Sequence, residues 1–315
     1  MVFQKFKVNL KKVLRNILVI VLAFLMCNFV LTKVVYDSCF KRQDATRSPS
    51  TVAKFSQMVS SRRELSFQSG ENTLAAYYYS GGLGLTLVVV VPGYTSGADD
   101  YLCQINSLVN DGYDVFAFDT TGSFNSEGES SVGFSQVLCD LDSALDYIEA
   151  NNRFGCKSLV LFGHSRGGYA AACVGRFGHT ADAVISVSGV NSAMEGIMDS
   201  SVQKIGGIAY LNYPALWFYQ STIFGTETVN VCADEEISQS GTPTFIIHGK
   251  NDVQLPYDEY SIISHRDEIT NRNVRYLLWD GDGNDGHTSI LFDKSGNANK
   301  ELMNEIDEFI KQSVA

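Results

Sequence analysis

The chain has 315 residues, of which 45% are hydrophobic and 19% are charged. This balance excludes intrinsically disordered and collagen-like sequences, and the length is enough for one α/β domain with a full core. The charge is uneven, because residues 1–42 hold eight Lys and Arg against one acidic residue, whereas residues 43–315 hold 16 against 34. An acidic body repels phosphate backbones, so we expect no nucleic-acid partner.

A basic start followed by an apolar run predicts a membrane anchor. Residues 16–32 are uncharged and mostly Ile, Leu, Val and Phe, at the lower end of the length that spans a hydrocarbon core of about 30 Å. No small-x-small cleavage site follows Thr32, which favours an uncleaved anchor over a signal peptide. The basic side chains before the run are Lys5, Lys7, Lys11, Lys12 and Arg15. We therefore expect a cytoplasmic end at 1–15, a transmembrane helix at 16–36 and an extracytoplasmic body, with secretion after cleavage as the alternative.

The polar residues 37–62 are expected to form a linker, and beyond them apolar runs of strand length alternate with amphipathic helical patterns. The strand-like runs are 64–67, 74–79, 85–91, 115–118, 159–162, 183–187, 245–247 and 274–279, and the helical patterns are 98–111, 137–148, 166–177 and 300–312. The first two runs are expected to pair as an antiparallel hairpin. The alternation of the rest predicts a mostly parallel sheet with helices on both faces, within one domain over residues 63–315.

Residues 190–241 interrupt this rhythm and are rich in aromatic side chains. The aromatic residues of the segment include Tyr210, Tyr213, Trp217, Phe218, Tyr219 and Phe224. A long insertion in a compact domain is usually a lid or a binding element, although ordinary packing helices are the alternative. We refer to residues 190–241 as the cap insertion.

The strongest motif is a G-x-S-x-G turn between a strand and a helix, with Ser165 at its centre. Side chains at Gly163 and Gly167 would collide with the neighbouring helix and strand, which explains the two glycines. The turn lifts the Ser165 hydroxyl above the carboxyl edge of the sheet and places it at a helix N-terminus, where negative charge is stabilised. These features predict a nucleophilic serine.

A serine nucleophile needs a base to remove its proton, and the chain has five histidines. His287 is favoured, because it follows the last strand in a Gly- and Asp-rich loop from which an imidazole can reach the strand ends. Asp252 directly follows a strand, and the order Ser, Asp, His is the one expected after such a turn. We therefore predict a triad of Ser165, His287 and Asp252. The residues disfavoured for these roles are His164, His179, His248 and His265, and the carboxylates Asp280, Asp282 and Asp285.

Acyl transfer also requires donors for an oxyanion, and the loss of one donor typically costs about 3 kcal/mol of barrier lowering. The backbone N–H of Arg166, the residue after the nucleophile, is one predicted donor. The other is the backbone N–H of Tyr94, in the loop after the strand 85–91, where Gly93 permits a tight path.

With these motifs in order, residues 64–313 resemble an α/β hydrolase, most closely the serine aminopeptidase and monoacylglycerol-lipase-like branch. Residues 118–128 also resemble the family's D-x-R-G-x-G-x-S-x-G loop, although Thr121 stands where Arg is usual. The resemblance implies the α/β-hydrolase fold and carries catalytic roles only onto the residues already named. The departure at Thr121 is expected to alter the anchoring of the loop and not the chemistry.

The resulting hypothesis is a membrane-anchored serine hydrolase that cleaves a carboxylic ester, an acylglycerol or small ester, through an acyl-enzyme. The aromatic cap insertion suits an apolar acyl group. A peptide or amide substrate is the close alternative, because acidic residues in or near the insertion can bind a free amine. These residues are Glu195, Asp199, Glu227 and Asp234 to Glu236. An acyltransferase and a non-catalytic binding protein on the same fold are further alternatives.

No metal or organic cofactor is expected. The run from Asp280 to Gly286 begins like a calcium loop, but its glycine falls one place late and Leu291 stands where a bidentate Glu is required. The seven cysteines show neither a C-x-x-C pair nor a spacing suited to zinc, and the sequence leaves open whether they are free thiols or disulfides.

Overall fold

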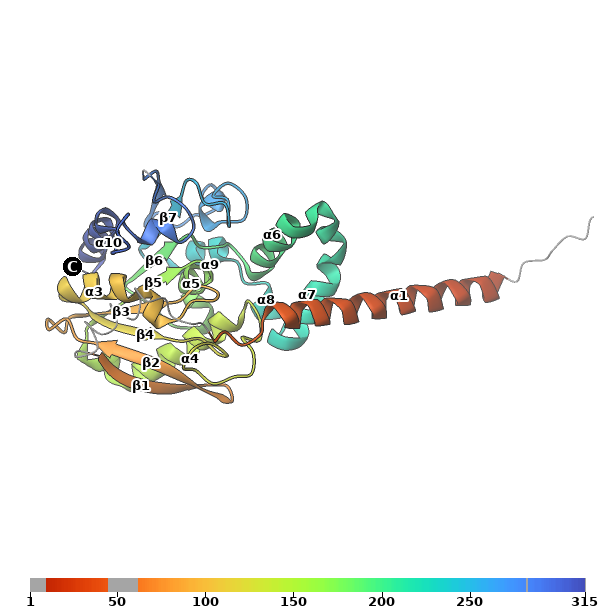
Figure 1. Ribbon diagram of the computed structural model, residues 1–315, viewed down its shortest axis with the longest axis horizontal. Coiled ribbons are helices and arrows are strands. Elements are labelled where there is room, and N and C mark those ends of the chain that lie inside the picture. The colour runs from red at the N-terminus through yellow and green to blue at the C-terminus, as the bar shows by residue number, and fades with distance from the viewer. Residues whose placement is uncertain (1–9, 45–61, 282, 315) are drawn as a thin grey trace, which may run out of the picture.

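The computed structural model describes residues 10–44, 62–281 and 283–314. One long helix, α1 (Leu10–Cys39), projects from a body that contains the sheet and the remaining helices (Figure 1). Residues 11–27 of α1 are exposed to solvent along their whole length. By length and composition alone, its segment Lys11–Cys39 is a candidate to cross a membrane.

The body is built on an eight-stranded sheet with the order β1-β2-β4-β3-β5-β6-β7-β8. The strands are β1 (Arg62–Ser69), β2 (Asn72–Tyr79), β3 (Thr86–Val91), β4 (Asp114–Phe118), β5 (Ser158–His164), β6 (Ala183–Val187), β7 (Thr244–Gly249) and β8 (Val274–Trp279). β1 and β2 form the predicted antiparallel hairpin, and β2 pairs antiparallel with β4. All the other pairs are parallel, so the carboxyl ends of β3 to β8 meet at one edge of the sheet.

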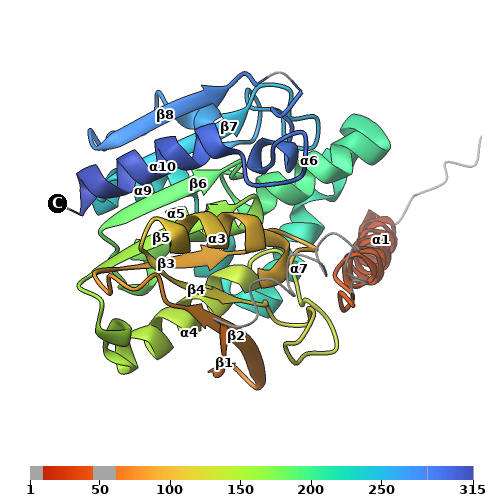
Figure 2. The same ribbon diagram turned by 60° about the vertical axis from the view of Figure 1, so that its left-hand side comes forward.

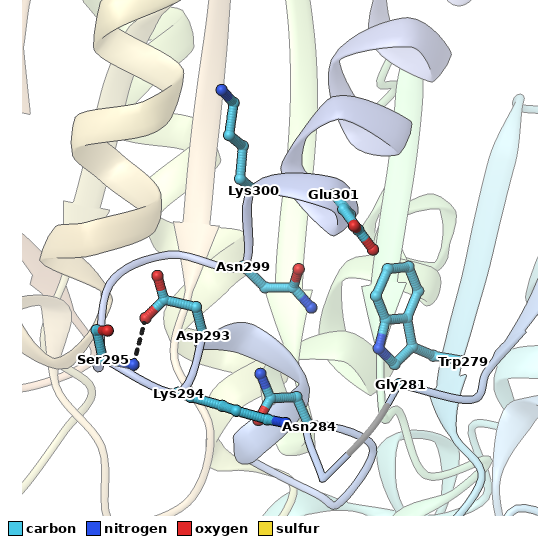
Figure 3. Close-up of a pocket in the computed structure, with 9 residues that line it drawn as sticks. All are labelled: Trp279, Gly281, Asn284, Asp293, Lys294, Ser295, Asn299, Lys300 and Glu301. Atoms are coloured by element: carbon cyan, nitrogen blue, oxygen red, sulfur yellow. Dashed lines mark hydrogen bonds between the residues drawn. The ribbon is translucent and has the colours of Figure 1, made fainter.

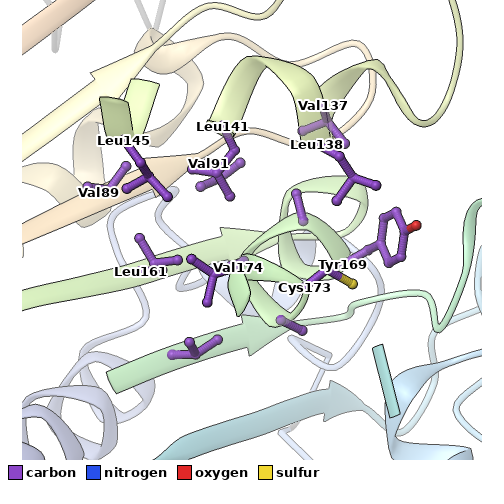
Figure 4. Packing of buried hydrophobic residues seen from close by; sticks show 14 of the residues in the cluster. Val89, Val91, Val137, Leu138, Leu141, Leu145, Leu161, Tyr169, Cys173 and Val174 are labelled. Atoms are coloured by element: carbon purple, nitrogen blue, oxygen red, sulfur yellow. The ribbon is translucent and has the colours of Figure 1, made fainter. Parts of the chain in front are cut away.

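Helices cover both faces of the sheet, as predicted (Figure 2). One face is covered by α4 (Gln136–Ala150), α5 (Arg166–Ala172) and α9 (Ala233–Ser240), and the other by α3 (Leu102–Asn110) and α10 (Lys300–Ser313). Strand β3 alternates between the two cores, because Val88 and Val90 pack towards α3, whereas Val89 and Val91 pack towards α4 and α5 (Figure 4). The continuous apolar run of β3 therefore reflects burial on both sides.

Short 3-10 segments complete the connections. They are η2 (Ala98–Tyr101), η3 (Asn152–Gly155), η4 (Val174–Phe177), η6 (Ile262–His265) and η7 (Ser289–Leu291). Several of them extend predicted helices, since η2 precedes α3 and η4 follows α5.

The cap insertion lies between β6 and β7 and is helical. Before α9 it contains α6 (Ala193–Ile205), η5 (Gly206–Asn212), α7 (Tyr213–Phe224) and α8 (Thr226–Val229). Ser192 caps α6 by accepting a hydrogen bond from the backbone N–H of Glu195, as an N-cap serine does. Figure 1 shows α6 and α7 at the end of the body from which α1 departs.

The second half of α1 packs into the cap insertion. Tyr36 and Phe40 are buried in an apolar cluster with Met194 of α6 and Tyr219 of α7. Nearer the N-terminus of α1, the ring of Phe29 meets that of Phe218 edge-on, with 5.6 Å between the ring centres. The helix is therefore part of the folded unit from about its last three turns onwards.

The predicted linker starts later than residue 37. Residues 37–39 are still helical, and Lys41 and Gln43 form β-bridges with Ser130 and Ser123 of the body. Arg42 donates hydrogen bonds of 2.8–2.9 Å to the carbonyl oxygens of Phe124, Ser126 and Gly128. The rest of the predicted linker, residues 45–61, lies outside the described residues. All seven cysteines are free thiols.

Candidate active site

Ser165 occupies the turn between β5 and α5 with φ 55° and ψ −121°, a backbone conformation that residues other than glycine rarely adopt. The two glycines are required by close packing, as predicted. A Cβ at Gly163 would lie 2.1 Å from the carbonyl oxygen of Gly167, and a Cβ at Gly167 would lie 2.1 Å from that of Val91 in β3. The strained turn thus holds the Ser165 hydroxyl at the carboxyl edge of the sheet.

The structure brings Ser165 and His287 together across 122 residues of sequence. The Nε2 atom of His287 lies 2.8 Å from the Oγ atom of Ser165, within the distance of a direct hydrogen bond. His287 is in the loop that follows β8, and its side chain is 11% exposed. The geometry lets the imidazole receive the hydroxyl proton without any movement of the loop.

Asp252, in the loop after β7, lies on the other side of the imidazole. Its Oδ2 is 2.6 Å from Nδ1 of His287, and its Oδ1 accepts the backbone N–H groups of Gln254 and Leu255 at 2.9 Å. Burial opposes ionisation of this carboxyl, but hydrogen bonds from His248 and His287 outweigh burial and hold its pKa well below the ordinary value. Asp252 is therefore a carboxylate that orients His287.

The residues that the sequence disfavoured have other partners. Asp280 is paired with Lys250 at 2.6 Å, and Asp285 accepts a hydrogen bond from Asn251 at 2.6 Å, while Asp282 lies outside the described residues. His179 is paired with Asp142 at 2.8 Å on the surface. His265 lies beside Glu268 and Glu195. His248 is buried behind the triad, with Nε2 3.2 Å from Asp252.

The two predicted oxyanion donors lie beside Ser165, on the loop after β3 and at the start of α5. Within the described residues, the backbone N–H groups of Tyr94 and Arg166 make no hydrogen bond to the protein. Arg166 is the first residue of α5, whose first amides have no intrahelical acceptor. Gly93 brings the other loop close, since a Cβ there would lie 3.3 Å from Cβ of Ser165. Free amides beside a nucleophile are suited to bind a developing oxyanion.

The chain is similar to known proteins in part of its sequence and in its fold. The family described as serine aminopeptidase, S33, matches residues 85–221, which include Ser165. Solved structures with the same fold include an esterase from Pyrococcus furiosus (TM-score 0.63, 18% identity, 88% of this chain and 100% of that chain). They also include an α/β hydrolase from Vibrio vulnificus (0.63, 17%, 90% and 92%) and Est1E from Butyrivibrio proteoclasticus with ferulic acid bound (0.58, 15%, 79% and 99%). The chain has the α/β-hydrolase fold. No curated protein matches its sequence.

The matched family and the fold are consistent with the predicted class of enzyme, a serine hydrolase. Hydrogen bonds of Thr120 and Thr121 anchor the loop 118–128. Thr121, which replaces the usual Arg, binds Asp140 through its backbone N–H and its hydroxyl at 2.8 and 2.7 Å. The neighbouring Thr120 accepts a hydrogen bond of 3.1 Å from the buried guanidinium of Arg166.

A hydrogen-bonded relay beneath the nucleophile was not predicted from the sequence. The Gly93 N–H donates to the Tyr101 hydroxyl at 2.9 Å, and that hydroxyl lies 2.9 Å from Nδ1 of His164. The Nε2 atom of His164 is 2.9 Å from the backbone carbonyl oxygen of His287. Because a carbonyl only accepts, Nε2 carries the hydrogen and Nδ1 accepts from Tyr101. Burial lowers the pKa of His164 to about 3, so it stays neutral.

This relay connects the two loops that carry the predicted oxyanion donor Tyr94 and the predicted base His287. Gly93 precedes the predicted oxyanion donor Tyr94, and the far end of the relay holds the backbone of His287. The sequence signals for it are weak, since Tyr101 resembles a core aromatic and His164 resembles a packing residue of the turn. Backbone partners, which no motif encodes, give both residues their role.

The cavity in front of Ser165 has a volume of about 300 Å³. Its walls come from the oxyanion loop, the cap insertion and the loops that carry Asp252 and His287, and they include Phe134, Val190 and Leu255. Asp199 of α6 also lines the cavity, although it is only 4% exposed. Of the acidic residues proposed for amine binding, it alone is among the described residues that line the cavity. Burial raises the pKa of its carboxyl.

A second cavity, of about 410 Å³, lies between the end of β8 and the start of α10 (Figure 3). Its described lining is mainly polar and includes Trp279, Asn284, Lys294 and Glu301. It shares no lining residue with the cavity at Ser165. The triad therefore opens only onto the first of these two cavities.

Proposed function

We propose that the protein is a membrane-anchored serine hydrolase that cleaves carboxylic esters through an acyl-enzyme. The observation that carries the proposal is the continuous set of contacts from Ser165 Oγ through His287 to Asp252, at 2.8 and 2.6 Å. A hydroxyl with this arrangement becomes a nucleophile, because the imidazole takes its proton while the carboxylate stabilises the imidazolium.

The reaction proceeds in two halves. Ser165 attacks the ester carbonyl while His287 takes the hydroxyl proton, and the backbone N–H groups of Tyr94 and Arg166 hold the oxyanion. His287 then gives the proton to the leaving alcohol, which breaks the ester C–O bond and leaves an acyl group on Ser165. A water molecule, deprotonated by His287, attacks the acyl group, and Ser165 recovers its proton as the acid leaves.

A fluorophosphonate probe tests the nucleophile. The folded protein is expected to be labelled, and Ser165→Ala is expected to abolish both labelling and ester hydrolysis. Ser188→Ala is the matched control, because Ser188 is a buried serine whose backbone N–H donates to Ile247 and which has no hydrogen bond to a triad residue within the described chain. Absence of labelling in folded wild-type protein would support the non-catalytic binding protein instead.

Peptide or amide hydrolysis is the second candidate, and Asp199 favours it. A carboxylate in the wall of the cavity is placed to bind the free ammonium group of an aminoacyl substrate. Esters of increasing acyl length and aminoacyl arylamides, assayed side by side, separate the two candidates. If the ammonium contact matters, Asp199→Asn lowers kcat/KM for the arylamides and leaves the esters unchanged. An added alcohol acceptor in the same assay reveals acyl transfer in place of hydrolysis.

We propose that α1 is a retained anchor. The expected transmembrane segment 16–36 includes Phe29 and Tyr36, which pack against the cap insertion, so cleavage after the apolar run would remove part of a buried cluster. The basic residues before the run place the N-terminus in the cytoplasm and the body outside. The intact mass of the membrane-extracted protein tests retention, and a protease added to intact cells tests the orientation.

A further inference from the structure

Outside α1, exposed apolar side chains gather on the cap insertion. They are Ile205, Ile208, Tyr210, Leu211, Tyr213 and Phe218, with exposed fractions from 41% for Tyr213 to 79% for Leu211. We call these six residues the cap rim. No charged residue occurs from 205 to 226, although the body as a whole is acidic. An uncharged apolar patch on an acidic protein marks an interaction surface.

Helix α7 carries part of the cap rim and is apolar on every side. Only Leu216, Tyr219 and Gln220 of this helix are buried, so several of its apolar side chains face outwards. A helix that is apolar all round belongs in a core or in a membrane. Tyr213 is 41% exposed, and Phe218 remains 55% exposed although its ring meets Phe29 of α1.

The depth of α1 fixes what lies against the cap rim. At 1.5 Å per residue, the 17 uncharged residues from 16 to 32 extend about 26 Å, close to the thickness of a hydrocarbon core. The outer end of this stretch touches the cap insertion, since Phe29 meets Phe218 at 5.6 Å and Thr32 Oγ1 lies 2.9 Å from Asn212 Oδ1. The cap rim is therefore level with the outer surface of the hydrocarbon.

Polar contacts begin immediately beyond this level. Lys33, the first charged residue after the apolar run, is paired with Asp37 at 2.5 Å and donates to the Tyr219 hydroxyl at 3.2 Å. Tyr and Trp side chains are enriched at the boundary between lipid and water. The tyrosines of the cap rim, Tyr210 and Tyr213, fit this belt. Figure 1 shows the turn between α6 and α7 extending in the direction in which α1 leaves the body.

We propose that the cap rim lies in the outer headgroup layer of the membrane that α1 spans, so that the cavity at Ser165 receives acyl substrates from the lipid surface. Helix α6 connects the two sites. Its residues Asp199 and Ser200 line the cavity, and Ile205 at its end belongs to the cap rim, about 8 Å further along the helix axis. The inference rests on the proposed membrane anchor.

Quenching by lipid tests the contact without requiring activity. Full-length Leu211→Trp and Leu83→Trp proteins are reconstituted into phosphatidylcholine vesicles that carry bromine near the top of the acyl chains, and into unbrominated vesicles. Leu83 is a matched control, because it is 66% exposed and precedes β3 at the opposite edge of the sheet. Excess quenching of Leu211→Trp over Leu83→Trp is expected, since the native tryptophans contribute equally to both.

The same preparation separates the failure of this inference from that of the anchor. Protein that does not float with the vesicles refutes the anchor, whereas floating protein with equal quenching in the two variants refutes the cap contact alone. A second measurement uses Leu211→Glu. It is expected to raise KM about tenfold for an ester embedded in the vesicles and to leave a short water-soluble ester unchanged. An equal effect on both esters would contradict the proposed route from the lipid surface.

Discussion

Removal of one oxygen atom, in Tyr101→Phe, tests whether the relay beneath Ser165 positions the catalytic loops. The substitution leaves the Gly93 N–H and the His164 Nδ1 without partners in a region where Tyr101 is 2% exposed. Buried groups left unpaired cost about 1–3 kcal/mol each, so the free energy of unfolding should fall by about 2–6 kcal/mol. A loss of only 1.4 kcal/mol in transition-state stabilisation lowers kcat about tenfold. We expect at least that fall in kcat with little change in KM, because Tyr101 does not line the cavity.

The assay combines steady-state ester hydrolysis with urea unfolding of the full-length protein in detergent micelles. Tyr113→Phe is the control, since Tyr113 makes one buried hydrogen bond of 2.8 Å to Asp307, far from the triad. It should lose about 1 kcal/mol of stability and keep its kcat. If Tyr101→Phe retains the kcat of Tyr113→Phe although its stability falls, the relay holds the fold and does not position the catalytic loops.

Three other outcomes are expected. Asp252→Asn should lower kcat about 10³-fold or more without unfolding the protein, because the amide no longer stabilises the imidazolium; unchanged kcat would remove Asp252 from the mechanism. Gly167→Ala should cost about 3 kcal/mol in a melting experiment, because its Cβ meets the Val91 carbonyl at 2.1 Å, whereas Gly207→Ala, with no atom within 4 Å, should be neutral. Burial raises the pKa of Asp199, so its carboxylate is protonated at a higher pH than an exposed aspartate is. On acidification, the hydrolysis of amine-bearing substrates should therefore weaken before the hydrolysis of esters does. Asp199→Asn should remove this difference.

Much of the fold follows from local patterns. The antiparallel hairpin, the alternation of strands and helices, and the turn at Ser165 each depend on residues close in sequence, so the sequence predicts them directly. The meeting of Ser165 with His287 follows from topology, because parallel strands bring their carboxyl ends to one edge. The strand order itself was not predicted, since apolar runs such as 159–162 and 183–187 are alike on both faces.

The features that sequence reasoning missed depend on contacts with backbone atoms or between distant segments. His164 and Tyr101 acquire their role from the carbonyl of His287 and the amide of Gly93, which carry no residue-type signal. The predicted helix ends at residue 36, whereas α1 continues to Cys39. The polar composition after Tyr36 indicates a linker, but burial of Phe40 and the hydrogen bonds of Arg42 keep this stretch against the body.

The hydrogen bonds of Arg42 make the connection between α1 and the body rigid and not flexible. An enzyme on a flexible linker can take many positions relative to its attachment point, and it can act on partners at many distances from that point. Here the guanidinium donates to the carbonyl oxygens of three alternate residues of one loop, and Gly133 leaves no room for even a methyl group beneath the Tyr36 hydroxyl. With α1 as the proposed membrane anchor, the proposed catalytic centre would be held at one height and one tilt, and lateral diffusion in the plane of the membrane would set its range of action.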